Sequence, residues 1–388
     1  MLYFDHAAST PPHEDVIRTL SEVMKLQYAN PSSLHRNGAE AGKLVQHARE
    51  LAAGLFGVSP KEWVFTSGGT ESNNLAILGA TRRYRARGNH IITTQVEHAS
   101  VYEAFEQLER EGFEVTYLPV DHNGRIRITD LEQALTDRTI LVSIMHVNNE
   151  TGAVQPVKEA GSLLAGRPKT LFHVDGVQGV GKLKVSLKDW HIDLFSMSAH
   201  KLNGPKGAGW LYVREGIELL PLVFGGGQEA GVRSGTENVP AIVGAAKALR
   251  LALESQADRQ LRMTALRRVL AEGIAEIPEL LLSGPAAGAE EGIMAPHIVH
   301  FCYPGMKPEV LVHALEKHGI AASTKSACSS KSNKPSRVLL AMGRDAACAG
   351  GGVRLSFGDE HRMEHIELVL ERLKAVVGKL KPLERREK

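Results

Sequence analysis

Short apolar runs alternate with segments of helical periodicity between about residues 40 and 220. The expected strands are 62–66, 90–94, 114–118, 140–145, 171–174, 194–197 and 209–213, and the expected helices include 41–55, 71–85 and 101–111. Because parallel strands are joined by crossover helices, this alternation predicts a mostly parallel sheet with helices on both faces. Ligands of such sheets bind outside the carboxyl ends of the strands, so the polar residues that follow these runs are the first candidates for a site.

The rest of the chain predicts a second, smaller domain. A glycine-rich stretch at 225–236 interrupts the alternation, and a proline then opens a helical stretch at 240–277 that would connect the two parts. Beyond this connector we expect strands at 296–301 and 351–357 and helices at 308–318 and 364–380. We therefore assign the chain to the α/β class, with a large domain at 14–253 and a small α+β domain formed by 1–13 and 254–388.

Charge and cysteine content exclude several classes of protein. The 388 residues carry 46 Lys and Arg against 44 Asp and Glu, a balance that gives no overall field to attract nucleic acid or membranes. The start, Met1-Leu-Tyr-Phe-Asp-His6, has neither a basic nor an apolar signal region, and no run is long enough to span a membrane. Three cysteines, an odd number, argue against a disulfide scaffold and for a reducing compartment, so we expect a cytoplasmic protein. The sequence shows no His and Cys spacing typical of a metal site.

An aspartate and a lysine follow two of the predicted strands. Asp175 comes after the run 171–174, and Lys201 comes after the run 194–197, just before a glycine-rich turn at 204–209. A lysine amine forms a Schiff base with an aldehyde cofactor, and a carboxylate keeps the pyridine nitrogen of pyridoxal phosphate protonated, so that the ring acts as an electron sink. The pair therefore points to pyridoxal phosphate, although each residue alone also fits a surface lysine or a helix-capping aspartate.

A segment of small residues, 66–74, joins a predicted strand to a predicted helix. The first N–H groups of a helix point at a ligand with the positive end of the helix dipole, and small residues let the backbone approach that ligand. The segment is therefore a candidate phosphate cradle, with Gly69 and Thr70 as donors and Ser198 and His200 beside them. Its glycine spacing matches neither a Walker A loop nor a dinucleotide fingerprint. An ordinary helix start capped by Ser or Thr is the alternative.

Three other polar residues follow predicted strands or lie on one. His98 could stack on a cofactor ring and exchange protons near neutral pH, or it could have a structural role. Asn149 could hydrogen-bond a cofactor oxygen, or it could build a turn with Gly152. Arg354 alternates with apolar residues in 353–357, which suits it for bidentate capture of a substrate carboxylate, although a solvent-facing arginine would give the same pattern.

The three cysteines differ in their surroundings. Cys328 lies in a polar stretch, 323–336, that is rich in Ser and Lys and predicts an exposed loop. Neighbouring lysines would favour the thiolate, which is the nucleophilic form, and an exposed thiol without a function is an oxidation liability. We therefore expect a functional role for Cys328. Cys302 has the context of a buried strand residue and Cys348 lies among Ala and Gly, so neither is expected to replace it.

Together these motifs resemble those of the cysteine desulfurases, which belong to the fold type I superfamily of pyridoxal phosphate enzymes. The resemblance covers nearly the whole chain and is carried by Asn30-Pro-Ser-Ser-Leu-His35, Phe65-Thr-Ser-Gly-Gly-Thr-Glu-Ser-Asn-Asn74, Asn148-Asn-Glu150, His173-Val-Asp-Gly-Val-Gln178, Ser198-Ala-His-Lys201, Arg233-Ser-Gly-Thr236 and Ser326-Ala-Cys-Ser329. Two positions depart from the pattern of the family. His6 stands where the family usually has Tyr or Asn, and Gly69 replaces a frequent Ala.

The resemblance implies an enzyme that converts L-cysteine to L-alanine and transfers the sulfur to Cys328 as a persulfide. Lys201 would be the Schiff-base lysine, and His98 would stack on the cofactor ring. The cofactor would be pyridoxal 5'-phosphate, bound by Gly69, Thr70, Asn149, Asp175, Gln178, Ser198, His200 and Thr236, the last from the partner subunit of a homodimer. The substrate would be bound by Arg354, Asn149 and Asn30.

The resemblance also implies sulfur-acceptor proteins, such as an iron–sulfur scaffold, a tRNA thiolation enzyme or a protein of thiamine synthesis. A selenocysteine lyase or an aminotransferase on the same fold would use Lys201 and Asp175 but would not need Cys328. A non-enzymatic scaffold in a sulfur-transfer complex is a more distant alternative.

Overall fold

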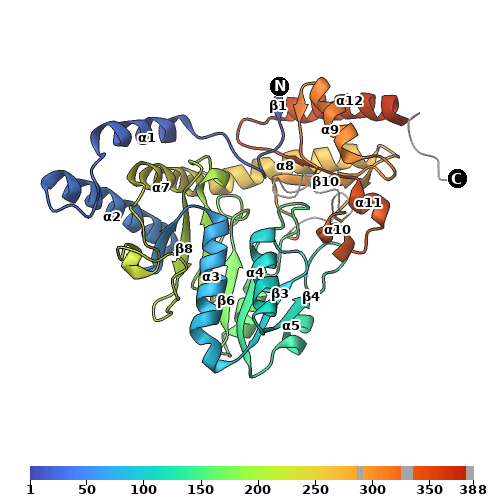
Figure 1. Ribbon diagram of the computed structural model, residues 1–388. Coiled ribbons are helices and arrows are strands. Elements are labelled where there is room, and N and C mark those ends of the chain that lie inside the picture. The colour runs from blue at the N-terminus through green and yellow to red at the C-terminus, as the bar shows by residue number, and fades with distance from the viewer. Residues whose placement is uncertain (286–287, 289–291, 325–334, 382–388) are drawn as a thin grey trace.

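A seven-stranded sheet and a three-stranded sheet organise the chain (Figure 1). The computed structural model describes residues 1–285, 288, 292–324 and 335–381. The larger sheet has the strand order β2 (Trp63–Thr66), β8 (Gly209–Val213), β7 (Leu194–Ser198), β6 (Leu171–Asp175), β5 (Thr139–Met145), β3 (His90–Thr94) and β4 (Glu114–Leu118). Neighbouring strands are parallel from β7 to β4, whereas β8 is antiparallel to both β7 and β2. The mostly parallel sheet expected from the sequence is confirmed.

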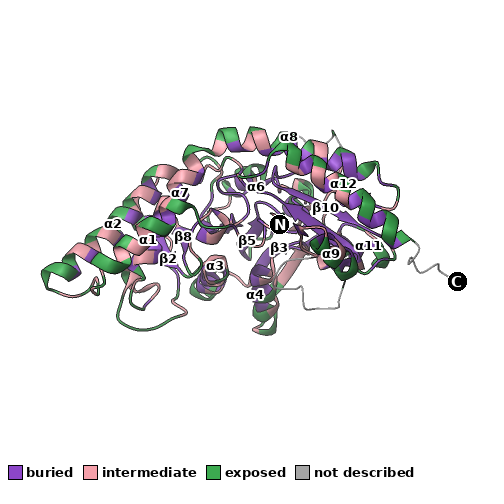
Figure 2. Cartoon of the chain, turned by 90° about the horizontal axis from the view of Figure 1, so that it is seen from above, coloured by how far each residue is buried: buried purple, intermediate pink, exposed green. Residues whose placement is uncertain are grey.

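Both faces of this sheet are buried, as its unbroken apolar runs require. Along β6, Leu171 packs into one hydrophobic cluster and Phe172 into another, and β7 divides Leu194 and Phe195 in the same way, because successive side chains of a strand point to opposite faces. Figure 2 shows the strands as buried and the outer sides of the helices as exposed. The helices on the Leu171 side are α3 (Gly69–Tyr84) and α4 (Ala99–Arg110), and those on the Phe172 side are α2 (Arg36–Phe56), α5 (Ile128–Ala134), α6 (Val157–Leu164) and α7 (Val239–Glu254).

The smaller, antiparallel sheet lies in the C-terminal third of the chain. Its strand order is β12 (Gly352–Ser356), β10 (Ile298–Cys302) and β9 (Leu281–Leu282). It shares a separate hydrophobic cluster with α8 (Gln256–Ala275), α9 (Pro308–Lys317) and α12 (Met363–Leu380). The N-terminal Phe4 joins this cluster, because β1 (Leu2–Tyr3) pairs in parallel with β11 (Ile320–Ala321). The division into domains at 14–253 and at 1–13 with 254–388 stays a prediction.

The remaining helices are α1 (Glu14–Leu26), which packs on α7, and several helices of three to five residues. The short ones are α10 (Arg337–Ala341), α11 (Ala346–Gly350) and the 3-10 helices η1 (Pro60–Glu62), η2 (Arg85–Arg87), η3 (Ala199–Lys201) and η4 (Glu229–Gly231). Across the described ranges, no helix combines the length and the apolarity that crossing a bilayer requires.

The helical stretch expected at 240–277 is confirmed, and it consists of two helices, α7 and α8. The two helices meet at Ser255, whose ψ of 7° is not helical. The Ser255 hydroxyl donates to the carbonyl of Leu251 at 2.8 Å, a bond to residue i−4 that competes with the backbone ladder. The carbonyl of Ala252 accepts from Nη1 of Arg259 at 3.2 Å. A side chain of the second helix therefore stabilises the break.

Two of the three cysteines form a disulfide. Cys302 ends β10 and Cys348 lies in α11, and their sulfur atoms are bonded. The cysteine count argued against a disulfide scaffold, and the sequence analysis did not predict this single bond. The count carries no information about distance, and the two Cα atoms lie 5.3 Å apart, within the range that a disulfide spans. The bond ties α11 to the smaller sheet.

Gly161 on α6 should not tolerate a side chain. A Cβ atom at this position would lie 1.8 Å from the carbonyl oxygen of Trp190, a backbone atom that cannot rotate away. Gly161→Ala should therefore lower the free energy of unfolding by about 1–3 kcal/mol. Gly54→Ala on α2 is the matched control, because a Cβ there meets no atom within 4 Å. It should be neutral or stabilising by up to about 1 kcal/mol. Urea denaturation measures both, and equal effects would contradict this packing.

Candidate active site

A cavity of about 240 Å³ opens at the carboxyl ends of the parallel strands. Most of the predicted site residues line it, namely Gly69, Thr70, His98, Asn149, Asp175, Gln178, Ser198, His200, Lys201 and Arg354. They come from the segments that follow β3, β5, β6 and β7, from the start of α3 and from β12. The structure thus gathers residues from both sheets around one cavity.

Lys201 enters the cavity from η3, directly after β7. Its Nζ donates to the carbonyl oxygens of Ala7 and Ala8, the latter at 2.8 Å. Gln178 holds the same N-terminal segment by donating from Nε2 to the carbonyl of Ala7 at 2.8 Å. The amine that would bind an aldehyde therefore lies inside the cavity. Its acceptors come from a segment that the sequence did not place at the site.

Asp175 ends β6, and two hydrogen bonds fix its carboxylate. Oδ2 accepts from Nδ2 of Asn73 at 2.8 Å, and Oδ1 accepts from the backbone N–H of Val177 at 3.0 Å. Asn73 is buried on α3 and also donates to Oγ of Ser100 at 2.9 Å. Asn73 belongs to the small-residue segment 66–74, but no local pattern marked it as the partner of Asp175. The carboxylate is therefore oriented before any ligand binds.

The ring of His98 caps the start of α4. Its Nδ1 accepts from the backbone N–H of Ser100 at 3.2 Å and lies 2.9 Å from the Ser100 hydroxyl. Burial lowers the pKa of His98, and the negative charge of Asp175 offsets only part of this effect. The ring is therefore neutral near pH 7. Because Nδ1 is an acceptor, the proton of the neutral ring lies on Nε2. His98 thus offers the cavity a flat, uncharged ring.

Close backbone packing shapes the start of α3. Gly68 precedes the helix with a φ of +149°, a conformation that favours glycine. A Cβ atom on Gly209 would lie 2.6 Å from Cα of Gly68, so β8 can approach the turn only with glycine at that position. Gly69 and Thr70 at the start of α3 line the cavity, and the first N–H groups of a helix have no partner within the helix. Such a helix start favours an anion.

Lysines make this end of the cavity electropositive. His200 lines both the main cavity and an adjoining hollow that reaches Lys206. Burial lowers the pKa of His200 to about 4, and the charges of Lys201, Lys206 and Lys182 act in the same direction. A neutral His200 can still donate one hydrogen bond to an anion. With Ser198 beside it, this end of the cavity suits a phosphate group.

Arg354 reaches the cavity from the smaller sheet. The residue is only 1% exposed, so the alternative of a solvent-facing arginine is wrong. Its Nη1 donates to the carbonyl of Asn149 at 2.6 Å, and its Nη2 donates to Oδ1 of Asp5 at 2.8 Å. These two bonds fix a buried cation in the cavity wall. A guanidinium held in this way suits a substrate carboxylate.

A buried carboxyl group supports the loop that carries His98. Oε1 of Glu97 accepts from the Thr94 hydroxyl at 2.8 Å and from the N–H of Met145 at 2.9 Å. Burial raises the pKa of Glu97 to about 8, so the group is protonated at neutral pH. Arg337 on α10 donates to the carbonyl of Glu97 and thereby ties this loop to the C-terminal part of the chain. The sequence analysis singled out neither Glu97 nor Arg337.

Three predicted site residues do not line the cavity. Thr236 is exposed and lines a separate hollow. The resemblance implied that it contacts the cofactor of the partner subunit, so this position does not test that role. Asn30 is exposed between α1 and α2, where its Oδ1 accepts from the N–H of Ser32 at 2.9 Å. The structure therefore does not bring Asn30 to the cavity of its own chain. Cys328 lies outside the described residues.

The chain belongs to the class-V aminotransferases, whose family profile matches residues 2–369. Cysteine desulfurase IscS of Clostridium botulinum is 42% identical over 377 residues, which cover 97% of this chain and 94% of that protein. Cysteine desulfurase IscS of Escherichia coli O9:H4 is 43% identical over 387 residues, which cover 98% of this chain and 94% of the relative. Within class V, the chain is therefore a member of the cysteine desulfurase family.

Solved structures agree with this membership. A NifS-like protein matches with a TM-score of 0.90 and 36% identity, over 98% of this chain and 100% of that chain. A structure described as SspA in complex with cysteine matches with a TM-score of 0.79 and 36% identity, over 92% of this chain and 99% of the other. The resemblance and the fold expected from the sequence motifs are confirmed.

Glu97→Gln should remove a pH-dependent contribution to stability. The pKa of about 8 in the folded protein exceeds the ordinary value of 4.5, so between these values the folded chain retains a proton that the unfolded chain has released. The contribution of Glu97 to the free energy of unfolding is therefore complete below pH 4.5. It decreases as the pH rises towards about 8, by up to about 1.4 kcal/mol per pH unit.

The neutral amide introduced by Glu97→Gln cannot ionise, so the variant should become more stable relative to the wild type as the pH rises across this window. Urea denaturation of both proteins between about pH 5 and pH 8 measures the difference. A difference that does not change with pH would contradict the raised pKa of Glu97.

Proposed function

We propose that this protein is a cysteine desulfurase that uses pyridoxal 5'-phosphate to convert L-cysteine to L-alanine and passes the sulfur to Cys328. One observation carries the proposal: a single cavity holds the Lys201 amine, the Asp175 carboxylate and the anion-binding start of α3. These features match the aldehyde, the ring nitrogen and the phosphate of the cofactor. The relatives named cysteine desulfurase support the choice of L-cysteine as the substrate.

The polar groups of the cavity fit the cofactor one by one. Lys201 would bind its aldehyde, and Asp175, held by Asn73, would bind the ring nitrogen. The N–H groups at the start of α3, with Ser198 and His200, would bind the phosphate. When bound, pyridoxal phosphate supplies an electron sink that makes the α-proton of an amino acid acidic.

Other residues would position the cofactor and the substrate. The neutral ring of His98 would cover one face of the cofactor, and Gln178 and Asn149 would contact its ring oxygen. Arg354 would hold the substrate carboxylate. Lys201 lines the cavity, and its amine would be free to accept a proton after the substrate amine has taken its place on the aldehyde. Lys201 would therefore act as the base that removes the α-proton.

The sulfur step needs a thiolate. Sγ of Cys328 would attack the sulfur of the substrate, so that an S–S bond forms as the C–S bond breaks. The electron pair of the broken bond stays on the carbon, which becomes the methyl group of alanine after protonation. L-cysteine and the Cys328 thiol thus give L-alanine and a persulfide, with no external oxidant or reductant.

The active form would be a homodimer. Thr236 would then reach the phosphate site of the neighbouring subunit, in keeping with its exposed position away from the cavity of its own chain. Tyr28, Leu34 and Phe224 are between 81% and 104% exposed. Large apolar side chains exposed to this extent are typical of an interface, and a dimer would cover them.

Three further expectations remain part of the proposal. The sulfur acceptors would be an iron–sulfur scaffold, a tRNA thiolation enzyme or a protein of thiamine synthesis. The location would be cytoplasmic. The domains would be 14–253 and, together, 1–13 and 254–388.

Borohydride reduction should trap pyridoxal phosphate on Lys201. The nearby Lys182 is buried and donates its Nζ to the carbonyl of Lys201, so it is not expected to react. Peptide mass spectrometry of the wild type should show one labelled peptide, which contains Lys201. Lys201→Ala should lose both the label and alanine formation. Lys206→Ala, at an exposed lysine near the anion end, is the control and should keep the label. A label on another lysine would sink the cofactor assignment.

Cys328→Ser should stop sulfur transfer but leave cofactor loading intact. A serine hydroxyl is a far weaker acid and nucleophile than a thiol, so alanine formation should decrease by at least about 100-fold. The Cys302→Ser/Cys348→Ser double variant is the control, because these buried sulfur atoms are bonded to each other. It should still form the persulfide. Wild-type alanine formation by Cys328→Ser would instead favour a lyase on the same fold.

A further inference from the structure

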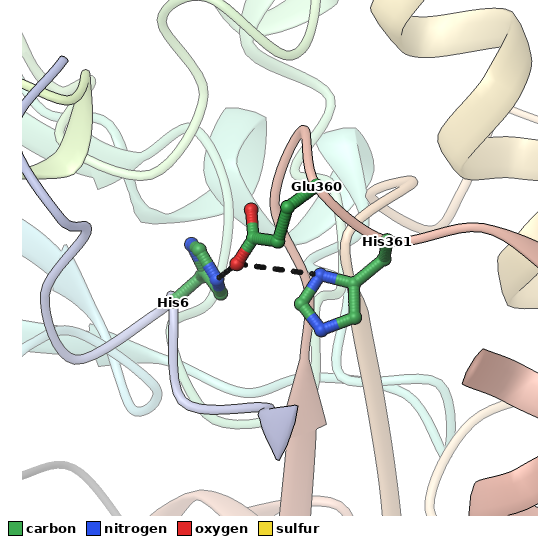
Figure 3. Close-up of side chains that lie close together, drawn as sticks. All are labelled: His6, Glu360 and His361. Atoms are coloured by element: carbon green, nitrogen blue, oxygen red, sulfur yellow. Dashed lines mark hydrogen bonds and ion pairs between the residues drawn. The ribbon is translucent and has the colours of Figure 1, made fainter. Parts of the chain in front are cut away.

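Two histidines and a glutamate meet outside the candidate active site (Figure 3). His6 follows β1, whereas Glu360 and His361 lie in the loop between β12 and α12. Nε2 of His6 is 2.6 Å from Oε1 of Glu360, and Nδ1 of His361 is 3.7 Å from the same oxygen. One ligand atom from each residue lies within 4.8 Å of the other two. None of the three residues lines the cavity that contains Lys201.

Core packing fixes the two imidazole rings. His6 is 3% exposed and His361 is 1% exposed. The ring of His361 packs edge-on against Phe4, with centroids 4.3 Å apart, and against His6, with centroids 5.4 Å apart. The side chain of Glu360 is half exposed, and its Oε1 already lies beside both rings. The cluster therefore combines two buried nitrogen ligands with one half-exposed oxygen ligand.

A backbone hydrogen bond orients the ring of His361. The N–H of Gly358 donates to its Nδ1 at 3.0 Å, which leaves the ring proton on Nε2 and a lone pair on Nδ1. A metal needs such a lone pair on a neutral imidazole. An ion bound at Nδ1 would replace this one hydrogen bond.

We propose that His6, Glu360 and His361 bind one divalent transition-metal ion of the zinc class. Two imidazoles and a carboxylate form a mixed nitrogen and oxygen ligand set, which suits Zn²⁺, Co²⁺ or Ni²⁺. Ca²⁺ and Mg²⁺ prefer oxygen ligands alone. Three protein ligands leave one position of a tetrahedral ion open for water. Without the ion, a hydrogen bond of 2.6 Å joins Nε2 of His6 and Oε1 of Glu360.

The bound ion would stabilise a wall of the cavity. The N–H of His6 donates to the carbonyl of Ser356 at 3.3 Å, and the N–H of Ala7 donates to Oγ of Ser356 at 2.9 Å. The carbonyl of Ala7 in turn accepts from Lys201 and Gln178. An ion held by His6 would therefore tie this segment more firmly to the loop after β12. The inference concerns metal binding and stability and does not depend on the desulfurase activity.

Equilibrium dialysis against Zn²⁺, with the metal counted by elemental mass spectrometry, tests the site. The protein should be untagged, loaded with pyridoxal phosphate and carry Cys328→Ser, so that neither a tag nor that thiol contributes ligands. We expect about one Zn²⁺ per chain at pH 8. A chain that retains no Zn²⁺ would overturn the proposal.

Three variants and one control locate the ion. His6→Gln, His361→Gln and Glu360→Gln should each weaken Zn²⁺ binding by at least about 10-fold. Glu360 is half exposed, so Glu360→Gln keeps the test valid if a buried variant fails to fold. His365→Gln is the matched control, because the ring of His365 lies 5.9 Å from that of His361 but outside the cluster.

Thermal denaturation gives a second readout. Zn²⁺ should raise the melting temperature of the Cys328→Ser protein and of the His365→Gln control, but not that of the three ligand variants. Equal Zn²⁺ binding by Glu360→Gln and the control, or loss of binding in His365→Gln alone, would place the ion elsewhere and overturn the proposal.

Discussion

The parallel orientation of β3, β5, β6 and β7 is the constraint on which the candidate site depends. These four strands are neighbours in the sheet, so the residues that follow them meet at one edge. His98, Asn149, Asp175 and Lys201 each follow or end a different strand, yet all line one cavity. A reversed strand would carry its polar residue to the opposite edge. The strand order and direction thus bring the functional groups to one edge of the sheet, independently of contacts between their side chains.

Contacts between distant parts of the chain complete this arrangement. Arg354 from the smaller sheet donates to the backbone of Asn149 and to the side chain of Asp5. The segment that carries Asp5 also supplies the carbonyl acceptors of Lys201. The cavity therefore requires the smaller sheet and the N-terminal segment to pack against the larger sheet. The proposed metal ion at His6 would act on this same segment, which links its binding to the stability of the cavity wall.

The sequence predicted the strands better than the contacts between them. The bounds of β3, β4 and β8 match the expected 90–94, 114–118 and 209–213, because short runs rich in β-branched and aromatic residues predict strands. The short helices α5 and α6 were missed, since one or two turns give little periodicity. The break at Ser255, the disulfide of Cys302 and the meeting of His6 with His361 depend on contacts across the fold. No local pattern in the sequence contains that information.

The central claim is that this chain splits L-cysteine and holds the sulfur on Cys328. A single turnover with L-cysteine that carries a heavy isotope of sulfur, run without any thiol reductant, measures this claim most directly. We predict that alanine and the isotope-labelled Cys328 peptide form at the same rate and in equal amounts. Alanine that appears while the heavy sulfur leaves directly as free sulfide, with no labelled peptide at any time, would contradict the proposed mechanism.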